Sequence, residues 1–193
     1  MPPRIQYSKE AIIDAGFAIA RRDGLEAVNA RAIAAKLGCS TQPLFREFQT
    51  MEQIKAAILA QAWAYYQRYT LDAMKAADKP YKASGMAYLR FAKEETPLFK
   101  ALFMRDRGAE AAVRDGNDPA ARLAVETLAR NTGMTPERAG LFHLFIWMFV
   151  HGMASMIATN SAVFSEEEIE GLISGAYHAL VEGFAAEERG KES

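Results

Sequence analysis

Four side chains between residues 41 and 46 have the types and spacing needed to read DNA bases. They stand at i, i+1, i+4 and i+5, so on a helix they project from one side: Thr41, Gln42, Phe45 and Arg46. A glutamine pairs with the edge of an adenine, and an arginine pairs with guanine or with a phosphate. Taken singly, each of these residues has the alternative interpretation of an ordinary solvent-facing side chain.

Arg31 gives a second sign of contact with an anion. It falls in the first turn of a helix that Asn29 caps, where a cation meets the positive end of the helix dipole and costs about 0.3–1 kcal/mol. A phosphate bound at that helix end reverses the sign, because helix N-termini bind anions. The position therefore indicates a contact with the DNA backbone.

A second group of chemically active side chains lies in the C-terminal half. His143, Trp147 and His151 stand at i, i+4 and i+8 and form one stripe on a helix. They are hydrogen-bonded core or interface residues, the wall of a ligand cavity, or, for two of them, metal ligands. No acidic or cysteine partner stands at ligand spacing, so we predict no metal and no cofactor.

Ligand pockets are lined mostly by apolar and aromatic groups with few polar ones. The predicted pocket therefore accepts a small apolar or aromatic effector, and its residues are Tyr88, Phe91, Phe103, His143, Trp147 and His151. Motifs of enzymes are missing: there is no phosphate-binding loop, nucleotide fingerprint, nucleophile elbow or metal motif. We predict that the protein is not an enzyme, with an all-α enzyme of unrecognised site as the alternative.

Composition agrees with a cytoplasmic binding protein. Half of the 193 residues are hydrophobic and 24% are charged, as in a soluble globular protein. The single cysteine, Cys39, excludes an intrachain disulfide and fits a reducing compartment. Charged residues interrupt the first twenty positions, which argues against a secretory signal peptide. Residues 1–50 carry a net charge of +2 and the remainder −3, which is compatible with DNA binding by the N-terminal part.

Nearly every segment has the helical period, and Gly and Pro fall between segments, so we predict an all-α fold of about nine helices. Side chains that cap helix starts are Ser8, Asn29, Ser40, Asp118 and Thr135, and capping boxes pair Thr50 with Gln53 and Ser165 with Glu168. The helix capped by Ser40 is expected to run through Phe48 and to tolerate Pro43 in its first turn.

Three short helices in the first 50 residues have the layout of a helix-turn-helix. The link at residues 38–40 is short and begins with a glycine, which sets two helices at a steep angle. The predicted core of this part is Ile12, Ala15, Ile19, Val28, Ile33, Leu37, Leu44 and Phe48. We predict a helix-turn-helix domain over 1–50 and a helical effector-binding and dimerisation domain over 51–193.

The segment from Ile33 to Phe48, with the preceding helix over 12–24, resembles the DNA-binding signature of TetR-family transcriptional regulators. Residues 87–92, residues 97–103 and the set Trp147, His151 and Gly152 resemble one C-terminal subgroup with a Trp-His-Gly pattern. The resemblance implies a cytoplasmic homodimer that binds a palindromic double-stranded DNA operator and is released by a ligand. It implies a repressor, with an activator as the alternative.

The predicted DNA-binding set is Arg31, Ser40, Thr41, Gln42, Phe45, Arg46 and Thr50. Phe45 departs from the family pattern, which has a tyrosine whose hydroxyl reaches a phosphate, and Met51 stands where the family has a lysine. Losing two phosphate contacts predicts weaker non-specific affinity and a shallower salt dependence. A ligand-binding or interaction module that has lost DNA binding is therefore the alternative function.

Residues 141–158 approach a membrane span in length and apolarity, but they contain two histidines and start after a Thr-Pro pair. We predict no membrane span and a helix buried on all sides, with the core on one face and a partner subunit on the other. The resemblance implies that the last two helices of each subunit form a four-helix dimer interface, with Phe149, Gly152, Met156, Gly171, Gly175 and Tyr177 in it. A ligand is expected to shift the long helix that starts at Thr50. This shift changes the separation of the two helix-turn-helix domains of the dimer.

Overall fold

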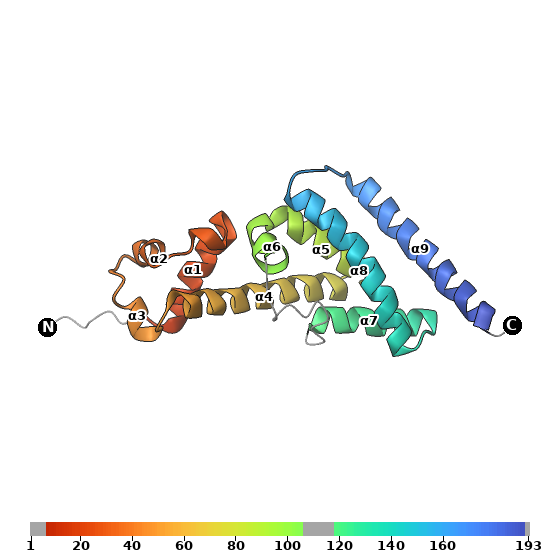
Figure 1. Ribbon diagram of the computed structural model, residues 1–193, viewed down its shortest axis with the longest axis horizontal. Coiled ribbons are helices and arrows are strands. Elements are labelled where there is room, and N and C mark those ends of the chain that lie inside the picture. Colours follow the sequence, from red (N-terminus) through yellow and green to blue (C-terminus); the bar gives the residue numbers. More distant parts are fainter. Residues whose placement is uncertain (1–6, 106–117, 192–193) are drawn as a thin grey trace. The chain divides into compact units, whose positions relative to one another are not determined.

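The computed structural model describes residues 7–105 and 118–191. Within these residues the chain forms nine α-helices and one short 3-10 helix and no strands, which confirms the predicted all-α fold (Figure 1). Contacts divide the described residues into two compact units, one of residues 7–66 with 95–105 and the other of residues 67–94 with 118–191. The predicted domain boundary at residue 50 stays a prediction.

The first unit contains α1 (Lys9–Asp23), the 3-10 helix η1 (Leu25–Ala27), α2 (Ala30–Leu37), α3 (Leu44–Glu47), the first part of α4 (Met51–Lys75) and α6 (Thr96–Phe103). The starts of α1 and α2 and the end of α2 lie where the sequence predicts them. The Ser8 hydroxyl accepts a hydrogen bond from the Ala11 N–H at 3.2 Å, and the Asn29 side chain accepts one from the Ala32 N–H at 3.0 Å. Gly38 ends α2 at a φ of 69°, in the left-handed region.

The third helix is shorter than predicted. It begins at Leu44 and ends at Glu47, so Ser40 does not cap it and residues 41–43 form a turn. Proline explains the difference: Pro43 has no N–H to continue a helical hydrogen-bond ladder, and its ring disfavours helical backbone at the residue before it. The expectation that the helix would begin at the Ser40 cap and run through Pro43 was wrong, whereas its C-terminal end, with Phe48 as the C-cap, lies where the sequence predicts it.

The start of α4 shows half of the predicted capping box. The Thr50 hydroxyl accepts a hydrogen bond from the Gln53 N–H at 3.2 Å, as predicted. The Gln53 side chain, however, accepts from the N–H of Gln49 at 2.8 Å instead of from Thr50. Both bonds satisfy donors at the helix start, so α4 is fixed at the end that follows α3.

The core of the first unit is a layer of aliphatic side chains between α1, α2, α3 and α4. Six of the eight predicted members are buried, while Leu37 and Phe48 are half-buried. Phe48 follows α3 in an extended conformation, and the Lys9 ammonium lies 5.7 Å from its ring. Ile54 and Ile58 of α4 complete the core, and Ile58 packs directly on Gly16.

The second unit contains the end of α4 with α5 (Pro80–Glu94), α7 (Pro119–Thr132), α8 (Pro136–Ala158) and α9 (Glu166–Lys191). Asp118 and Thr135 cap their helices through the Ala120 and Arg138 N–H groups, as predicted. The capping box at the start of α9 is complete, because Glu168 accepts from the Ser165 N–H at 2.7 Å and Ser165 accepts from the Glu168 N–H at 3.2 Å.

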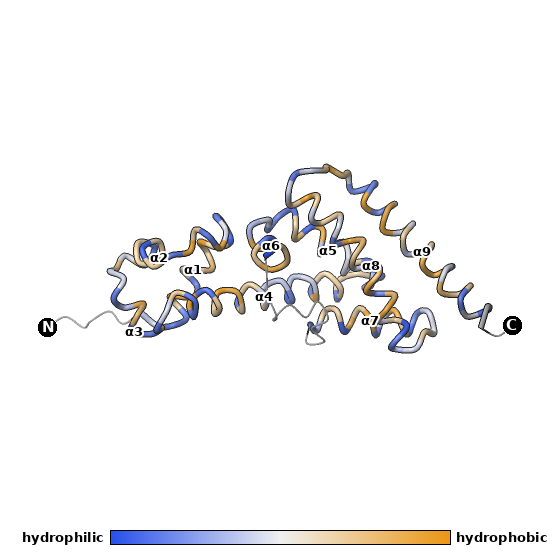
Figure 2. Tube along the Cα trace, viewed as in Figure 1, coloured by the Kyte–Doolittle hydropathy of each residue, from blue (hydrophilic) through white to orange (hydrophobic). Residues whose placement is uncertain are grey.

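Helix α8 is the centre of the second unit and contacts α5, α7 and α9. Phe91 of α5 and Phe142 of α8 are fully buried. The Phe142 ring packs edge-on against Tyr177 and Phe184 of α9, with centroids 5.5 and 5.3 Å away. Hydrophobic residues follow α8 along its length (Figure 2). They exceed what the core of a single chain takes up, so part of α8 stays open.

Candidate nucleic-acid interface and effector site

The predicted DNA-binding residues lie at the surface of the first unit. Gln42 and Arg46 are exposed and Phe45 is 45% exposed, while Leu44 between them is fully buried and fixes the short helix on the core. Arg31, Ser40 and Thr50 are also exposed, and Thr41 is half-buried. Because α3 starts at Leu44, Thr41 and Gln42 are presented by a turn, while Phe45 and Arg46 are presented by the helix.

The three cations of α2 and α3 are exposed and have no acidic partner in the described part of the chain. Arg31, Lys36 and Arg46 form no ion pair there. Two other arginines of the same unit are paired, Arg21 with Glu95 and Arg22 with Asp23. Exposed cations without carboxylate partners are available to neutralise phosphates, which is the main source of affinity for DNA.

In the second unit, two tyrosines of α5 pair with the two histidines of α8. The Tyr88 hydroxyl lies 2.8 Å from Nδ1 of His151, and the Tyr81 hydroxyl lies 3.3 Å from Nδ1 of His143. Trp147 stacks on His151 with ring centroids 4.9 Å apart and planes 13° apart. Because the residue numbers rise together in the two pairs, α5 and α8 run parallel. We call the line of contact formed by Tyr81, Tyr88, His143, Trp147 and His151 the aromatic seam.

These pairs give the seam an uncharged aromatic surface. Burial lowers the pKa values of His143 and His151, because an imidazolium loses hydration in a protein interior. Burial, followed by the nearby Tyr177 hydroxyl, raises the pKa of Tyr81. At neutral pH the histidines and Tyr81 are therefore uncharged, which suits an uncharged ligand better than an ionic one.

Acid should destabilise the folded protein through these histidines. In the unfolded chain a histidine takes up a proton near pH 6.5, but in the folded chain the lowered pKa values delay that uptake. The unfolded state therefore binds more protons, and the free energy of unfolding falls as the pH drops from about 7 to about 5. Urea unfolding of the wild type and of a His143→Asn/His151→Asn variant at both pH values measures this. An equal loss in the two proteins would contradict the assignment.

The remaining predicted pocket residues fall in different surroundings. Phe91 is fully buried and packs edge-on against Tyr69, and Tyr88 is buried. Phe103 belongs to the first unit, where its ring contacts Trp63, Tyr66 and Phe99 at centroid distances of 5.2, 5.0 and 5.1 Å. Sequence reasoning grouped Phe103 with the others because it could not tell which aromatic residues share a core.

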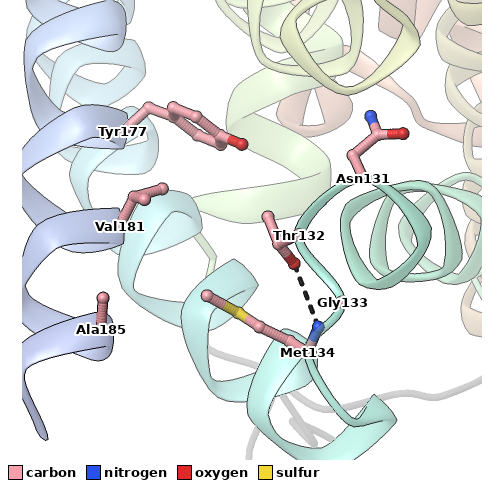
Figure 3. A pocket seen from close by; sticks show the side chains of 7 residues that line it. All are labelled: Asn131, Thr132, Gly133, Met134, Tyr177, Val181 and Ala185. Atoms are coloured by element: carbon pink, nitrogen blue, oxygen red, sulfur yellow. Dashed lines mark hydrogen bonds between the residues drawn. The ribbon is translucent and has the colours of Figure 1, made fainter. Parts of the chain in front are cut away.

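A pocket of about 300 Å³ opens between the α7–α8 turn and α9 (Figure 3). Its lining is Asn131, Thr132, Gly133, Met134, Tyr177, Val181 and Ala185. The Tyr177 ring extends from α9 toward the end of α7 in this view. Apart from Tyr177, which was predicted at the dimer interface, none of these residues was singled out by the sequence. The pocket arises from the meeting of two distant segments, which no local pattern signals.

One side of α8 exposes large apolar side chains: Leu141, Phe145, Met148, Phe149 and Met156 are 39–48% exposed. The sequence predicts the core on one face of α8 and a partner subunit on the other, and in the single chain only the core face is covered; the partner stays a prediction. Gly152, Gly171 and Gly175 border space that none of the described residues fills, because a Cβ on any of them would meet no atom of those residues within 4 Å. By length and composition α8 is also the one helix among the described residues that is able to cross a membrane.

Three comparisons place this geometry among known proteins. Residues 12–58 match the family model described as bacterial regulatory proteins of the tetR family, and residues 81–180 match the tetracyclin repressor-like C-terminal domain. No curated protein matches the chain. A solved structure, a TetR variant from Acinetobacter baumannii AYE in complex with minocycline, shares the fold with a TM-score of 0.56 and 18% identity over 96% of this chain and 99% of that chain.

The C-terminal match alone covers more than half of the chain, and the N-terminal match covers the helix-turn-helix. The matched regions contain both the exposed, unpaired cations of the first unit and the aromatic seam of the second. The chain belongs to the TetR family of bacterial regulatory proteins.

Proposed function

We propose that the protein is a sequence-specific transcriptional repressor that binds a palindromic DNA operator as a homodimer in the cytoplasm and leaves it when a small molecule binds. The observation that carries the proposal is the exposed surface of the first unit, where Arg31, Lys36 and Arg46 have no acidic partner in the described residues. Gln42 and Arg46 supply base contacts, and Arg31 and Thr50 contact phosphates.

The homodimer rests on the open side of α8. Exposed apolar patches of this kind mark interaction surfaces in soluble proteins. A second copy of the chain accounts for both the apolar side chains and the unfilled space at Gly152, Gly171 and Gly175. When a second copy covers these apolar side chains, no membrane is needed to shield them from water. A twofold dimer carries two helix-turn-helix domains, so the operator consists of two half-sites about 34–36 Å apart or a multiple of that.

The effector is an uncharged apolar or aromatic molecule that contacts the seam formed by Tyr88, His143, Trp147 and His151. The uncharged Tyr–His pairs and the Trp147–His151 stack support this class of ligand. The related TetR structure is described as a complex with minocycline, which is consistent with a small-molecule effector for the present protein. The Trp-His-Gly subgroup is our proposed placement within the family.

Release requires that the effector bind better to a form that does not fit DNA. Helix α4 is continuous from Met51 to Lys75 and contributes residues to both units. We therefore propose that effector binding shifts α4 and changes the separation of the two helix-turn-helix domains.

The specific observation that favours the alternative, a binding module without DNA affinity, is the pair Phe45 and Met51. Neither side chain has a group that donates a hydrogen bond to phosphate. Such a module would bind ligand but no DNA sequence.

Arg46→Ala should weaken operator binding by about tenfold or more, because it removes a base or phosphate contact worth about 1–3 kcal/mol. The operator is first selected from a random DNA pool with the purified protein, and its affinity is then measured by fluorescence anisotropy. Arg22→Ala is the matched control, because Arg22 lies in the same unit but is already paired with Asp23. Failure of the wild type to select any sequence would refute the repressor and favour the binding module.

A further inference from the structure

A single carboxylate joins three segments of the first unit. Glu95 lies between α5 and α6, at the N-cap of α6, and is 6% exposed. The Arg21 Nε of α1 donates to both of its oxygens, at 3.0 and 2.8 Å, and the Arg21 Nη2 donates to Oε1. The Tyr65 hydroxyl of α4 donates to Oε1 at 2.9 Å. The carboxylate thus receives hydrogen bonds from α1 and α4 while it belongs to the start of α6.

The two donors also contact each other. The Arg21 guanidinium lies 5.1 Å from the centroid of the Tyr65 ring, and Phe17, one turn earlier on α1, packs edge-on against the same ring at 5.7 Å. The hydrogen bond to Glu95 raises the pKa of Arg21. The three side chains therefore form a closed triangle in which each member is held by the other two, and its geometry fixes α1 against α4 and α6.

A neighbouring ion pair has the same chemistry without this geometry. Arg22 donates from Nε to Asp23 at 2.9 Å, but both residues lie at the end of α1, and their side chains are 76% and 39% exposed. That pair connects no separate segments. A buried carboxylate, in contrast, depends on its partners for the hydration that it has lost, so a displacement of α1 that breaks the hydrogen bonds from Arg21 is opposed at Glu95.

Helix α1 supports the other two helices of the helix-turn-helix domain, α2 and α3. It contacts α2, and its buried residues Ile12, Ala15 and Ile19 belong to the core on which α3 rests. We propose that Glu95 is a positioning residue for operator binding: through Arg21 and Tyr65 its carboxylate holds α1, and with it the helix-turn-helix, in the arrangement that fits DNA. This inference rests on the proposed DNA-binding function.

For Glu95→Gln, the loss of charge and the loss of positioning predict opposite changes in operator affinity. The variant removes a negative charge from the unit that faces DNA, so electrostatics alone tightens binding to every sequence. Loss of positioning instead weakens binding to the selected operator by about tenfold, while affinity for scrambled DNA stays the same or rises. Arg21→Lys keeps the positive charge but not the two-pronged hydrogen bonding, and should weaken operator binding similarly. Asp23→Asn is the matched control and should leave operator affinity within about twofold.

The experiment uses full-length protein with fluorescently labelled operator and scrambled duplexes, at a temperature where each variant is folded by circular dichroism. The fraction of active protein is set by stoichiometric titration, so a variant that is merely less stable shows an unchanged dissociation constant. Operator affinity that stays equal or rises in Glu95→Gln, in parallel with scrambled DNA, overturns the inference. If Glu95→Gln does not fold, Tyr65→Phe decides instead, because it removes one hydroxyl and keeps the ring.

For Tyr65→Phe we expect operator affinity to fall about threefold, and an unchanged value overturns the inference. Wild-type protein that selects no DNA sequence refutes the proposed function itself and the inference with it. A wild type that binds its operator, together with variants that bind equally well, refutes the positioning role alone.

Discussion

Phe149→Glu is expected to convert the protein into a monomer that binds its operator weakly. Phe149 is 39% exposed in the middle of the open side of α8, between Phe145 and Met156. In a twofold dimer each substitution occurs twice, so two carboxylates are brought into an apolar interface without partners. We expect the dissociation constant of the dimer to rise about 100-fold or more, because burying an unpaired charge costs several kcal/mol. Sedimentation velocity over a range of concentrations measures it.

Val163→Glu is the matched control for this variant. Val163 is 86% exposed in the segment that joins α8 to α9, so the same gain of charge at an apolar surface residue is expected to leave the dimer intact. If Phe149→Glu sediments as the wild type does, the open side of α8 is not the dimer interface. Operator affinity measured on the same samples shows whether a monomer retains the weaker binding expected of one half-site.

Phe142→Ala is expected to have the largest effect on stability. The Phe142 ring is fully buried in the second unit and packs edge-on against Tyr177 and Phe184. Truncation loses the burial of the ring and leaves a cavity, which together cost about 3–5 kcal/mol. The free energy of unfolding from urea titration, followed by circular dichroism at a fixed protein concentration, measures the loss.

Phe45→Ala provides the same truncation at the surface of the first unit. Because the Phe45 ring is 45% exposed, we expect its removal to change the free energy of unfolding by about 0.5 kcal/mol. Similar losses in the two variants would mean that Phe142 is not a central core residue. Phe45→Ala also reports on DNA: a loss of operator affinity without a loss of stability would assign Phe45 a contact with the operator.

Helix ends were predictable because the groups that fix them are neighbours in the chain. Ser8, Asn29 and Ser165 each satisfy an N–H three residues ahead, and Gly38 adopts the left-handed conformation that ends a helix. The same locality explains the error at α3. Ser40 is a good cap by type, but Pro43 three residues later prevents the helix that Ser40 would have capped.

Partners across helices were not predictable in the same way. The stripe of His143, Trp147 and His151 was visible in the sequence, but nothing in it named Tyr81 and Tyr88 as the hydrogen-bond partners, which lie 62 and 63 residues away in the chain. Phe103 shows the limit from the other side. Its type suited a pocket, and packing placed it in the aromatic cluster of the first unit.

The sequence by itself determined the helical fold, most helix boundaries and the family, because each of these depends on periodicity, capping and a motif read along the chain. Tertiary structure alone decided which apolar residues of α8 are buried and which stay exposed. It also brought Arg21 and Glu95 together across 74 residues, where neither side chain differs by type from an ordinary surface charge. The physical reason is that burial and pairing depend on which helix surfaces pack together, and many sequence-distant contacts must form together to fix that choice.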